Sequence, residues 1–294
     1  MRRPFLITLA AAAAGIPLAF AAVPAQASGG PTAPQHAGGI IASPLPPGQQ
    51  PDGLRPNPAI CPSGAEQCVD TIVTRMQRNY DADGCSHNAT FADLYLDTTL
   101  SIRDAVRNNE FSNRPFWNRI TETFGTYYLD SYKAWTKGEN TRVPQAWRIA
   151  FDAAAAGTTS TMGDIYLGIN AHVNRDLAFV YYQTGADNYE DHYHVNEVLG
   201  RAVNVAYPDI AAHLDDKVYG QMGGVPKEFD IIAWRELAWH NAQRLRLAPN
   251  ADARAAIAAE IEANALERAH EIEAAFPAAP GANAARDAYC AASR

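Results

Sequence analysis

The side chains best suited to chemistry gather at residues 170–176. His172 and Asp176 are four residues apart, so on a helix they share one face, and Asn170 and Asn174 repeat that spacing beside them. An imidazole and a carboxylate one helical turn apart can offer two ligands to a single metal ion. The segment therefore predicts a metal site, a metal-free acid–base pair, or a buried polar network that fixes helix register.

Further candidate metal ligands lie in later segments. Glu236 and His240 repeat the four-residue step, and His192 and His194 lie near the start of a helix expected from about residue 188. With the first pair, these side chains would surround zinc or another divalent cation inside a helical bundle. The alternatives are a surface histidine at 240, solvated histidines at 192 and 194, and a Glu236 carboxylate paired with an arginine. The metal-ligand candidates are His172, Asp176, His192, Glu236 and His240.

Arg175 adds a cation to the central segment. In a catalytic site it would neutralise an acidic group of the substrate, and in a structural one it would form an internal salt bridge with Asp97 or Asp191. The catalytic candidates are His172, Arg175 and Asp176. The candidates for placing a substrate are Asn170, Asn174 and Asn196.

A helix over about residues 161–183 must position the central segment. Its apolar residues recur at helical spacing, as in Ile165, Ile169 and Val173. Gly163 and Gly168 narrow the helix and let other helices approach closely. A helix that is apolar over much of its circumference is usually central to its domain. Its polar side chains must then be hydrogen-bonded or hold something.

The rest of the chain after residue 61 is also periodic at helical spacing, and no segment alternates at period two long enough for a sheet. A loop is expected at 220–225, and the last long helix is expected to end at 276–280, before Cys290. The sequence predicts an all-α fold, a single bundle of eight or nine helices around the central one. The other expected helices cover about 68–80, 89–107, 113–135, 144–157, 188–205, 208–214, 229–247 and 251–275.

The N-terminal 60 residues differ in composition from the rest. A charged start, an alanine-rich apolar segment and the small-residue pattern Ala25-Gln-Ala27 predict a cleaved signal peptide over 1–27. Arg2 and Arg3 also resemble the core of a twin-arginine leader, so Sec and twin-arginine export both stay open. Residues 28–60 are rich in Pro and Gly and predict a disordered lead-in to an all-α domain at 61–294. The mature protein is expected to be secreted, without a transmembrane anchor.

Four cysteines in an exported chain suggest two disulfides. Cys68 and Cys85 flank an expected helix of about a dozen residues, which is too long for them to pair easily. The preferred pattern is Cys61–Cys68 with Cys85–Cys290, and the other is Cys61–Cys85 with Cys68–Cys290. Zinc thiolate binding is a further alternative.

The charge of the chain bears on its partners. The formal net charge is −8, and without Arg2 and Arg3 it becomes −10, with 22 basic against 32 acidic residues. No basic run remains in the mature chain, which argues against stable binding of nucleic acid or an anionic membrane. A small-molecule or lipid substrate is the expected kind of partner, and the oligomeric state is not indicated.

Residues 169–177 resemble the hallmark segment of an uncharacterised, largely actinobacterial family catalogued as domain of unknown function 5995, whose members carry a near-identical Asn-Ala-His-Ile-Asn-Arg-Asp-Leu string. The resemblance covers roughly residues 69–247 and implies no activity. Further matching segments are Leu94-Tyr-Leu-Asp97, 116–132, Val143-Pro-Gln-Ala-Trp147 and 191–199.

Two functions follow from these observations. The first is a secreted metal-dependent hydrolase of a phosphoester or lipid, because the zinc-dependent phospholipase C and single-strand nuclease group also uses a His-x-x-x-Asp step on a helix of an exported all-α protein. The second is a non-catalytic extracellular helical protein whose polar central helix is structural or holds a small ligand.

Overall fold

The computed structural model describes residues 62–293, all within one compact unit. Every regular element in this range is a helix, and the only β-type pairing there is an isolated bridge between Thr159 and Pro277. The predicted all-α bundle is therefore confirmed. The predicted signal peptide and the predicted lead-in lie outside the described residues.

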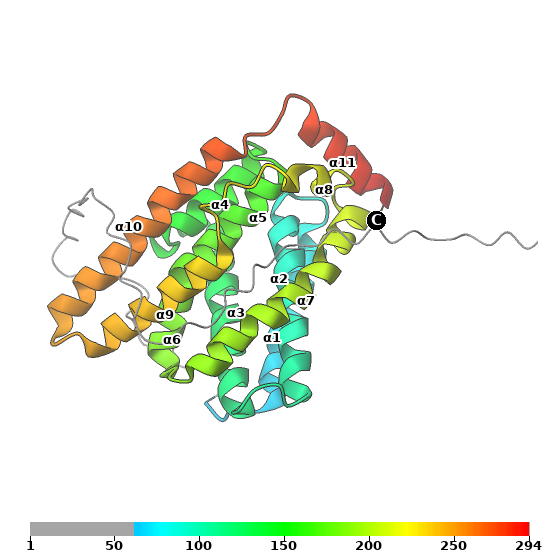
Figure 1. The fold of residues 1–294 in the computed structure, drawn as a ribbon. Coiled ribbons are helices and arrows are strands. Elements are labelled where there is room, and N and C mark those ends of the chain that lie inside the picture. Colours follow the sequence, from blue (N-terminus) through cyan, green and yellow to red (C-terminus); the bar gives the residue numbers. More distant parts are fainter. Residues whose placement is uncertain (1–61, 294) are drawn as a thin grey trace, which may run out of the picture. The chain divides into compact units, whose positions relative to one another are not determined.

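The helices follow one another through short connections (Figure 1). Two short elements are not α-helical: η2 is a 3₁₀ turn and η3 is a π-helix. The elements are α1 Glu66–Asp83, α2 Asn88–Arg107, α3 Arg114–Thr136, η2 Asn140–Arg142, α4 Gln145–Ala156, α5 Thr161–Ile169, η3 Asn170–Asp176, α6 Leu177–Thr184, α7 Tyr189–His213, α8 Val218–Met222, α9 Ile231–Leu247, α10 Ala251–Ala275 and α11 Ala282–Ser293.

Local chemistry defines several helix starts. The side chains of Asn113, Ser160, Asn188 and Asn250 each accept a hydrogen bond from a backbone N–H in the first turn of α3, α5, α7 and α10. Such caps satisfy N–H groups that have no partner within the helix. Gly157 ends α4 in the left-handed conformation, which glycine adopts without steric cost.

The central element is a continuous rod over residues 161–184, made of α5, η3 and α6. It packs against α2, α3, α4, α9 and α10, and every residue of α5 is buried. A Cβ atom added to Gly168 would lie 2.2 Å from the ring of Phe91, and one added to Gly163 would lie 2.8 Å from Thr159. The close approach of another helix expected at both glycines is present at Gly168, because Phe91 belongs to α2, whereas the atoms nearest to Gly163 belong to Thr159 and Phe276 outside the helices. The predicted central buried helix is confirmed.

The bundle differs from the predicted one in three places. Pro208 does not begin a new helix but lies inside α7, while α8 occupies part of the expected loop and α11 follows the expected break. A proline inside a helix costs about 3 kcal/mol, since its ring removes a hydrogen bond. Ala202, Ala206 and Ile210 continue one buried stripe across it, so packing of that stripe outweighs the local cost. With the rod counted as one helix, the described residues form ten rather than eight or nine.

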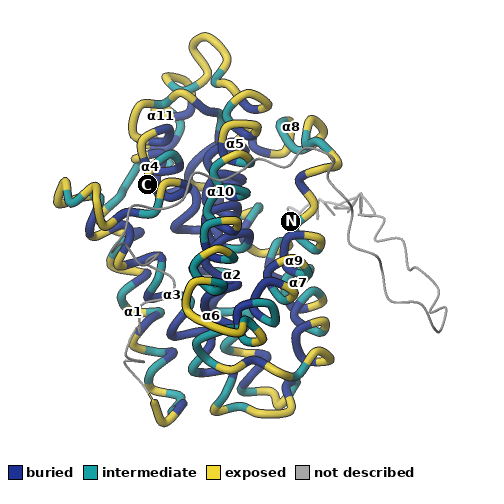
Figure 2. Tube along the Cα trace, turned by 90° about the vertical axis from the view of Figure 1, so that its left-hand side faces the viewer, coloured by how far each residue is buried: buried dark blue, intermediate teal, exposed yellow. Residues whose placement is uncertain are grey.

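The interior contains two groups of packed apolar side chains, and Val173 of η3 contacts both. The first is rich in aromatic rings from α2, α3 and α4, and the second lies around α6 and α9. Figure 2 shows buried and exposed stretches alternating along the long helices, so each turns one face to the core. The polar side chains of η3 are therefore enclosed on several sides.

A disulfide fastens the last helix to the chain before α2. Cys85 and Cys290 are bonded with their Cα atoms 5.8 Å apart, and Arg286 donates hydrogen bonds to the carbonyls of Cys85 and Ser86. This confirms the predicted Cys85–Cys290 pair. The other predicted pair involves Cys61, which lies outside the described residues.

Within 62–293 no helix has the length and apolar character needed to cross a bilayer.

Candidate functional site

The motif singled out in the sequence forms the π-helical part of the rod. The N–H of Leu177 donates to the carbonyl of His172, five residues earlier, where an α-helix would use the carbonyl four residues earlier. Such segments are rare and are frequent at functional sites. Within η3 every residue except Val173 is buried.

His172 is enclosed by aromatic rings. Its ring stacks on Phe124, with centroids 3.5 Å apart and planes 6° apart, and meets the edge of Tyr95 at 4.2 Å. Its Nδ1 lies 3.4 Å from Oδ2 of Asp176. Burial lowers the pKa of His172, although Asp176 acts to raise it. The imidazole is therefore neutral at pH 7.

Asp176 is fully buried, and both of its oxygens accept hydrogen bonds. Oδ2 accepts from Nε1 of Trp147 at 2.8 Å, and Oδ1 accepts from Nη1 of Arg175. Nε of Arg175 donates to both oxygens of Glu262 on α10 at 2.9 Å. Burial acts to lower the pKa of Arg175, but Glu262 and Asp176 outweigh it and raise that pKa. The arginine is thus a cation between two carboxylates.

The partners of Arg175 differ from the expected ones. The predicted salt bridge with Asp97 or Asp191 was wrong, because Asp176 and Glu262 take that place. Asp191 instead accepts from Nε1 of Trp117 at 2.9 Å, at the start of α7. The η3 network (Trp147, His172, Arg175, Asp176, Glu262) therefore joins the rod to α4 and α10.

The two asparagines of η3 also bind α10. Asn170 donates to the carbonyl of Ala265 at 2.8 Å, and Asn174 donates to Oδ1 of Asn170 at 3.0 Å and to Oδ1 of Asn264 at 2.9 Å. Both side chains are almost completely buried. These bonds fix how α10 is aligned along the rod, so both amides are held by the protein itself.

The predicted metal ligands are not brought together. His240 is exposed on α9, and Glu236 contacts His192 rather than the His172–Asp176 pair. Among residues 62–293 no group of three or more His, Cys, Asp or Glu side chains is arranged to hold a metal ion. At Asp176 a metal ion would also meet the guanidinium of Arg175. The donor set around His172 and Asp176 therefore does not fit a metal ion.

His192 belongs to a second buried cluster. Its Nδ1 lies 2.9 Å from the hydroxyl of Tyr181, and its Nε2 lies 3.2 Å from Oε1 of Glu236. The ring stacks on Trp239, with centroids 4.9 Å apart. The interpretation of His192 as solvated was wrong, and burial lowers its pKa. The hydrogen bond with His192 lowers the pKa of Glu236.

Glu236 and His194 also differ from expectation. No arginine in the described part of the chain lies within 4 Å of Glu236, whose second partner is the hydroxyl of Tyr189 at 3.0 Å. His194 is half-buried between Glu110 and Glu197. Neither residue reaches the η3 network.

An apolar cavity separates the two buried clusters. It measures about 60 Å³, counted as the room available to the centre of a water molecule. Tyr95 and Phe124 of its wall also contact His172, and Tyr181 and Arg235 belong to the His192 side. Of the lining residues in the described part of the chain, Arg235 alone is charged. The interior cavity is lined by Tyr95, Thr98, Thr99, Ile102, Trp117, Ile120, Thr121, Phe124, Leu177, Tyr181, Val195, Leu199 and Arg235.

Comparison with known proteins gives one match. A family model described as a family of unknown function (DUF5995) matches residues 69–275. The chain belongs to this family. No curated protein and no solved structure matches the chain. The η3 network and the interior cavity of this DUF5995 protein both lie within the matched residues.

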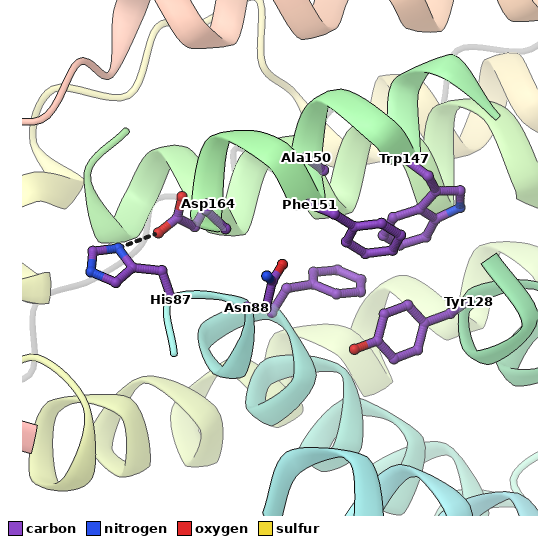
Figure 3. Close-up of a pocket in the computed structure, with 10 residues that line it drawn as sticks. His87, Asn88, Tyr128, Trp147, Ala150, Phe151 and Asp164 are labelled. Atoms are coloured by element: carbon purple, nitrogen blue, oxygen red, sulfur yellow. Dashed lines mark hydrogen bonds and ion pairs between the residues drawn. The ribbon is translucent and has the colours of Figure 1, made fainter. Parts of the chain in front are cut away.

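A second histidine–aspartate pair lies beside a much smaller cavity (Figure 3). Nδ1 of His87 is 3.3 Å from Oδ2 of the buried Asp164, whose other oxygen accepts from Thr159 at 2.6 Å. Burial raises the pKa of Asp164. Nε2 of His87 contacts Asp287 on α11 at 3.2 Å. The cavity measures about 10 Å³, which suits at most one water molecule. This pair therefore ties α11 to α2 and α5.

Several members of the two clusters escaped the sequence reasoning. Trp147 appears in the sequence only within a segment that resembles the family, and no motif singles out Glu262 or Asn264. A signal existed for the last two, because they flank the buried Ile261 and Ala265 on α10. Polar residues beside a buried stripe often contact a neighbouring helix. No sequence motif includes Arg235, and only its burial in the structure marks it as a candidate site residue.

Proposed function

We propose that this DUF5995 protein is a non-catalytic binding protein that holds a small, largely apolar molecule in the interior cavity. The polar network of η3 is then structural and keeps the cavity wall in place. This proposal follows the second of the two predicted functions. Metal-dependent hydrolysis by this chain stays a prediction.

The η3 network supports a structural role. A catalytic acid, base or nucleophile must contact substrate and change its proton or its partner during the reaction. Here both oxygens of Asp176 and the guanidinium of Arg175 bind protein groups, and aromatic rings enclose His172. Only Glu262 retains appreciable exposure, at 28% of its side chain.

The interior cavity is the observation that carries the proposal. Protein interiors normally pack at crystal-like density, so an apolar cavity that exceeds one water molecule is unusual. Its lining is mostly aliphatic and aromatic, with a few hydroxyls and one cation, which is the composition typical of small-molecule sites. Thr98, Ile102 and Leu199 stay partly exposed, so α2 and α7 form its outer side.

The location of the protein is part of the same proposal. The Cys85–Cys290 disulfide is compatible with an oxidising compartment. Together with the leader predicted over residues 1–27, it supports export and function outside the cytoplasm. The N-terminal sequence of the secreted protein would show where the leader is removed.

The proposal is tested by titrating 1-hexanol into the purified protein and following heat release by calorimetry. Ile120 lines the cavity, so Ile120→Phe is expected to fill it and reduce hexanol affinity by about tenfold or more. Leu237→Phe adds bulk at a partly exposed position of α9 and serves as the control, with affinity unchanged. Absence of binding to wild type, or equal affinity in Ile120→Phe, contradicts the proposal.

Metal analysis of the same samples separates the two predicted functions. Stoichiometric zinc that disappears in His172→Ala together with a phosphoesterase activity would favour the hydrolase. The proposal expects no zinc bound through His172 and a loss of stability alone in that variant.

A further inference from the structure

Within residues 62–293 three arginine side chains are almost completely buried, and their partners differ. Arg175 pairs with Asp176 and Glu262, and Arg286 pairs with Asp287 at 3.1 Å. Arg235 is only 4% exposed, yet no carboxylate of residues 62–293 lies within ion-pairing distance of it. Buried cations are rarely left without a counter-charge.

The hydrogen bonds of Arg235 all go to neutral groups. Its Nε donates to Oδ1 of Asn196 at 2.8 Å, and Nη2 donates to the carbonyl of His192 at 2.9 Å. Nη2 also lies 3.5 Å from Nδ1 of His192. The next residue, Glu236, directs its carboxylate to His192 and Tyr189. The positive charge of Arg235 is therefore solvated by dipoles and not neutralised.

Among the described residues, Arg235 is also the only charged group in the wall of the interior cavity. Apolar side chains such as Ile102, Leu177 and Val195 form most of the rest of that wall. A ligand that satisfies both features needs an apolar body and one anionic group. A planar guanidinium binds a carboxylate through two parallel hydrogen bonds, which suits a carboxylic acid.

We infer that the ligand of the interior cavity is a small amphipathic carboxylate whose head group binds Arg235. This inference rests on the proposed function and adds the chemical class of the ligand. Asn196 is then a positioning residue, because it orients the guanidinium through Nε. Asn196 was predicted to place the substrate directly, and here it would do so through Arg235.

Three probes with the same chain and different head groups test the inference. Hexanoate, 1-hexanol and hexylamine are titrated by calorimetry into wild type at pH 7 and moderate salt. Hexanoate is expected to bind about tenfold or more tightly than hexanol, because a charge-assisted hydrogen bond contributes on that order. Hexylamine is expected to bind most weakly, since its cation meets the guanidinium.

Arg235→Met removes the charge at similar length, and Arg235→Lys keeps the charge without the planar fork. The methionine variant is expected to lose the preference for hexanoate and to keep hexanol binding within about threefold, and the lysine variant to retain part of the preference. Arg244→Met on the same helix, which removes an arginine paired with Glu260, is the control and should match wild type. Circular dichroism and thermal melts establish that each variant is folded.

The outcomes separate the two proposals. Equal binding of hexanol and hexanoate to wild type, or an undiminished preference for hexanoate in Arg235→Met, overturns the inference and leaves the cavity as a site for neutral molecules. Failure of all three probes to bind wild type overturns the proposed function itself. If Arg235→Met does not fold, the head-group preference of wild type and the Arg235→Lys affinities still decide the matter.

Discussion

Substituting Arg175 by methionine should destabilise the protein far more than the same substitution at Arg235. Arg175 is 1% exposed and binds a completely buried Asp176. Without the guanidinium, Asp176 keeps Trp147 and the neutral His172 as neighbours, so its charge is left uncompensated. Glu262 retains partial exposure and can turn to water. The main cost therefore falls on Asp176.

The size of the effect follows from the burial. Removing one partner of a buried ion pair costs about 3–5 kcal/mol. For a domain of this size that corresponds to a fall in Tm of roughly 6–20 °C. Arg235→Met leaves no carboxylate behind and loses hydrogen bonds to neutral groups, which costs about 1–2 kcal/mol. The two arginines have similar burial, so the difference isolates the ion pairing.

The free energy of unfolding of both variants is measured by urea titration at pH 7. Circular dichroism at 222 nm and tryptophan fluorescence monitor the unfolding. A double-mutant cycle with Asp176→Asn adds a second test. The double variant should lose less free energy of unfolding than the sum of the losses in the two single variants, by about 1 kcal/mol or more. The reason is that Asp176→Asn removes the uncompensated charge. If Arg175→Met costs no more than Arg235→Met, the reasoning about the η3 network is refuted.

Two further predictions concern pH and redox state. Burial and repulsion by Asp209 raise the pKa of Asp97 from 3.8 to about 6. The carboxyl group of Asp97 therefore binds a proton more tightly in the folded protein than in the unfolded chain. Protonated Asp97 contributes to the free energy of unfolding at low pH, and that contribution is lost as pH rises from about 4 to 6. Asp97→Asn should then stabilise the protein by about 1 kcal/mol at pH 7, allowing for solvent screening of a half-exposed group, and should have no effect at pH 4. Urea unfolding midpoints at the two pH values measure the difference. A stabilisation of equal size at pH 4 would contradict the raised pKa of Asp97. Replacing both Cys85 and Cys290 by serine should cost about 2–5 kcal/mol, because the bond closes a loop with a sequence separation of 205. Hydrogen exchange should rise first in α11, and unchanged protection of α11 would show that its packing alone holds it.

The class of the fold followed from the sequence because periodicity is a local property. The apolar stripe through Ile165 and Ile169 predicted the rod, and the helix over 68–80 correctly disfavoured a Cys68–Cys85 pair. The π-helical form of η3 was not predictable in this way. Residues four apart share a face of an α-helix, and that spacing does not reveal where an extra residue is accommodated.

The partners across the bundle were beyond local reasoning. Arg175 had several carboxylates to choose from, and only the packing of α10 against η3 selects Glu262. The interior cavity has no sequence signature, since Ile120 and Leu199 have the same pattern in a filled core. Pro208 shows the opposite limit, because a strong local signal for a helix start was overridden by burial of the residues around it.

The most direct test of ligand binding in the interior cavity is a methyl NMR titration with hexanoate. Five residues with methyl groups line that cavity: Ile102, Ile120, Leu177, Val195 and Leu199. Their methyl resonances are expected to shift together on titration, and all of the shifts should fit one dissociation constant. Those of Val69 and Ile72 on α1 lie outside the lining and should stay in place. Shifts confined to methyl groups outside the cavity, or no shifts at all, would contradict the account.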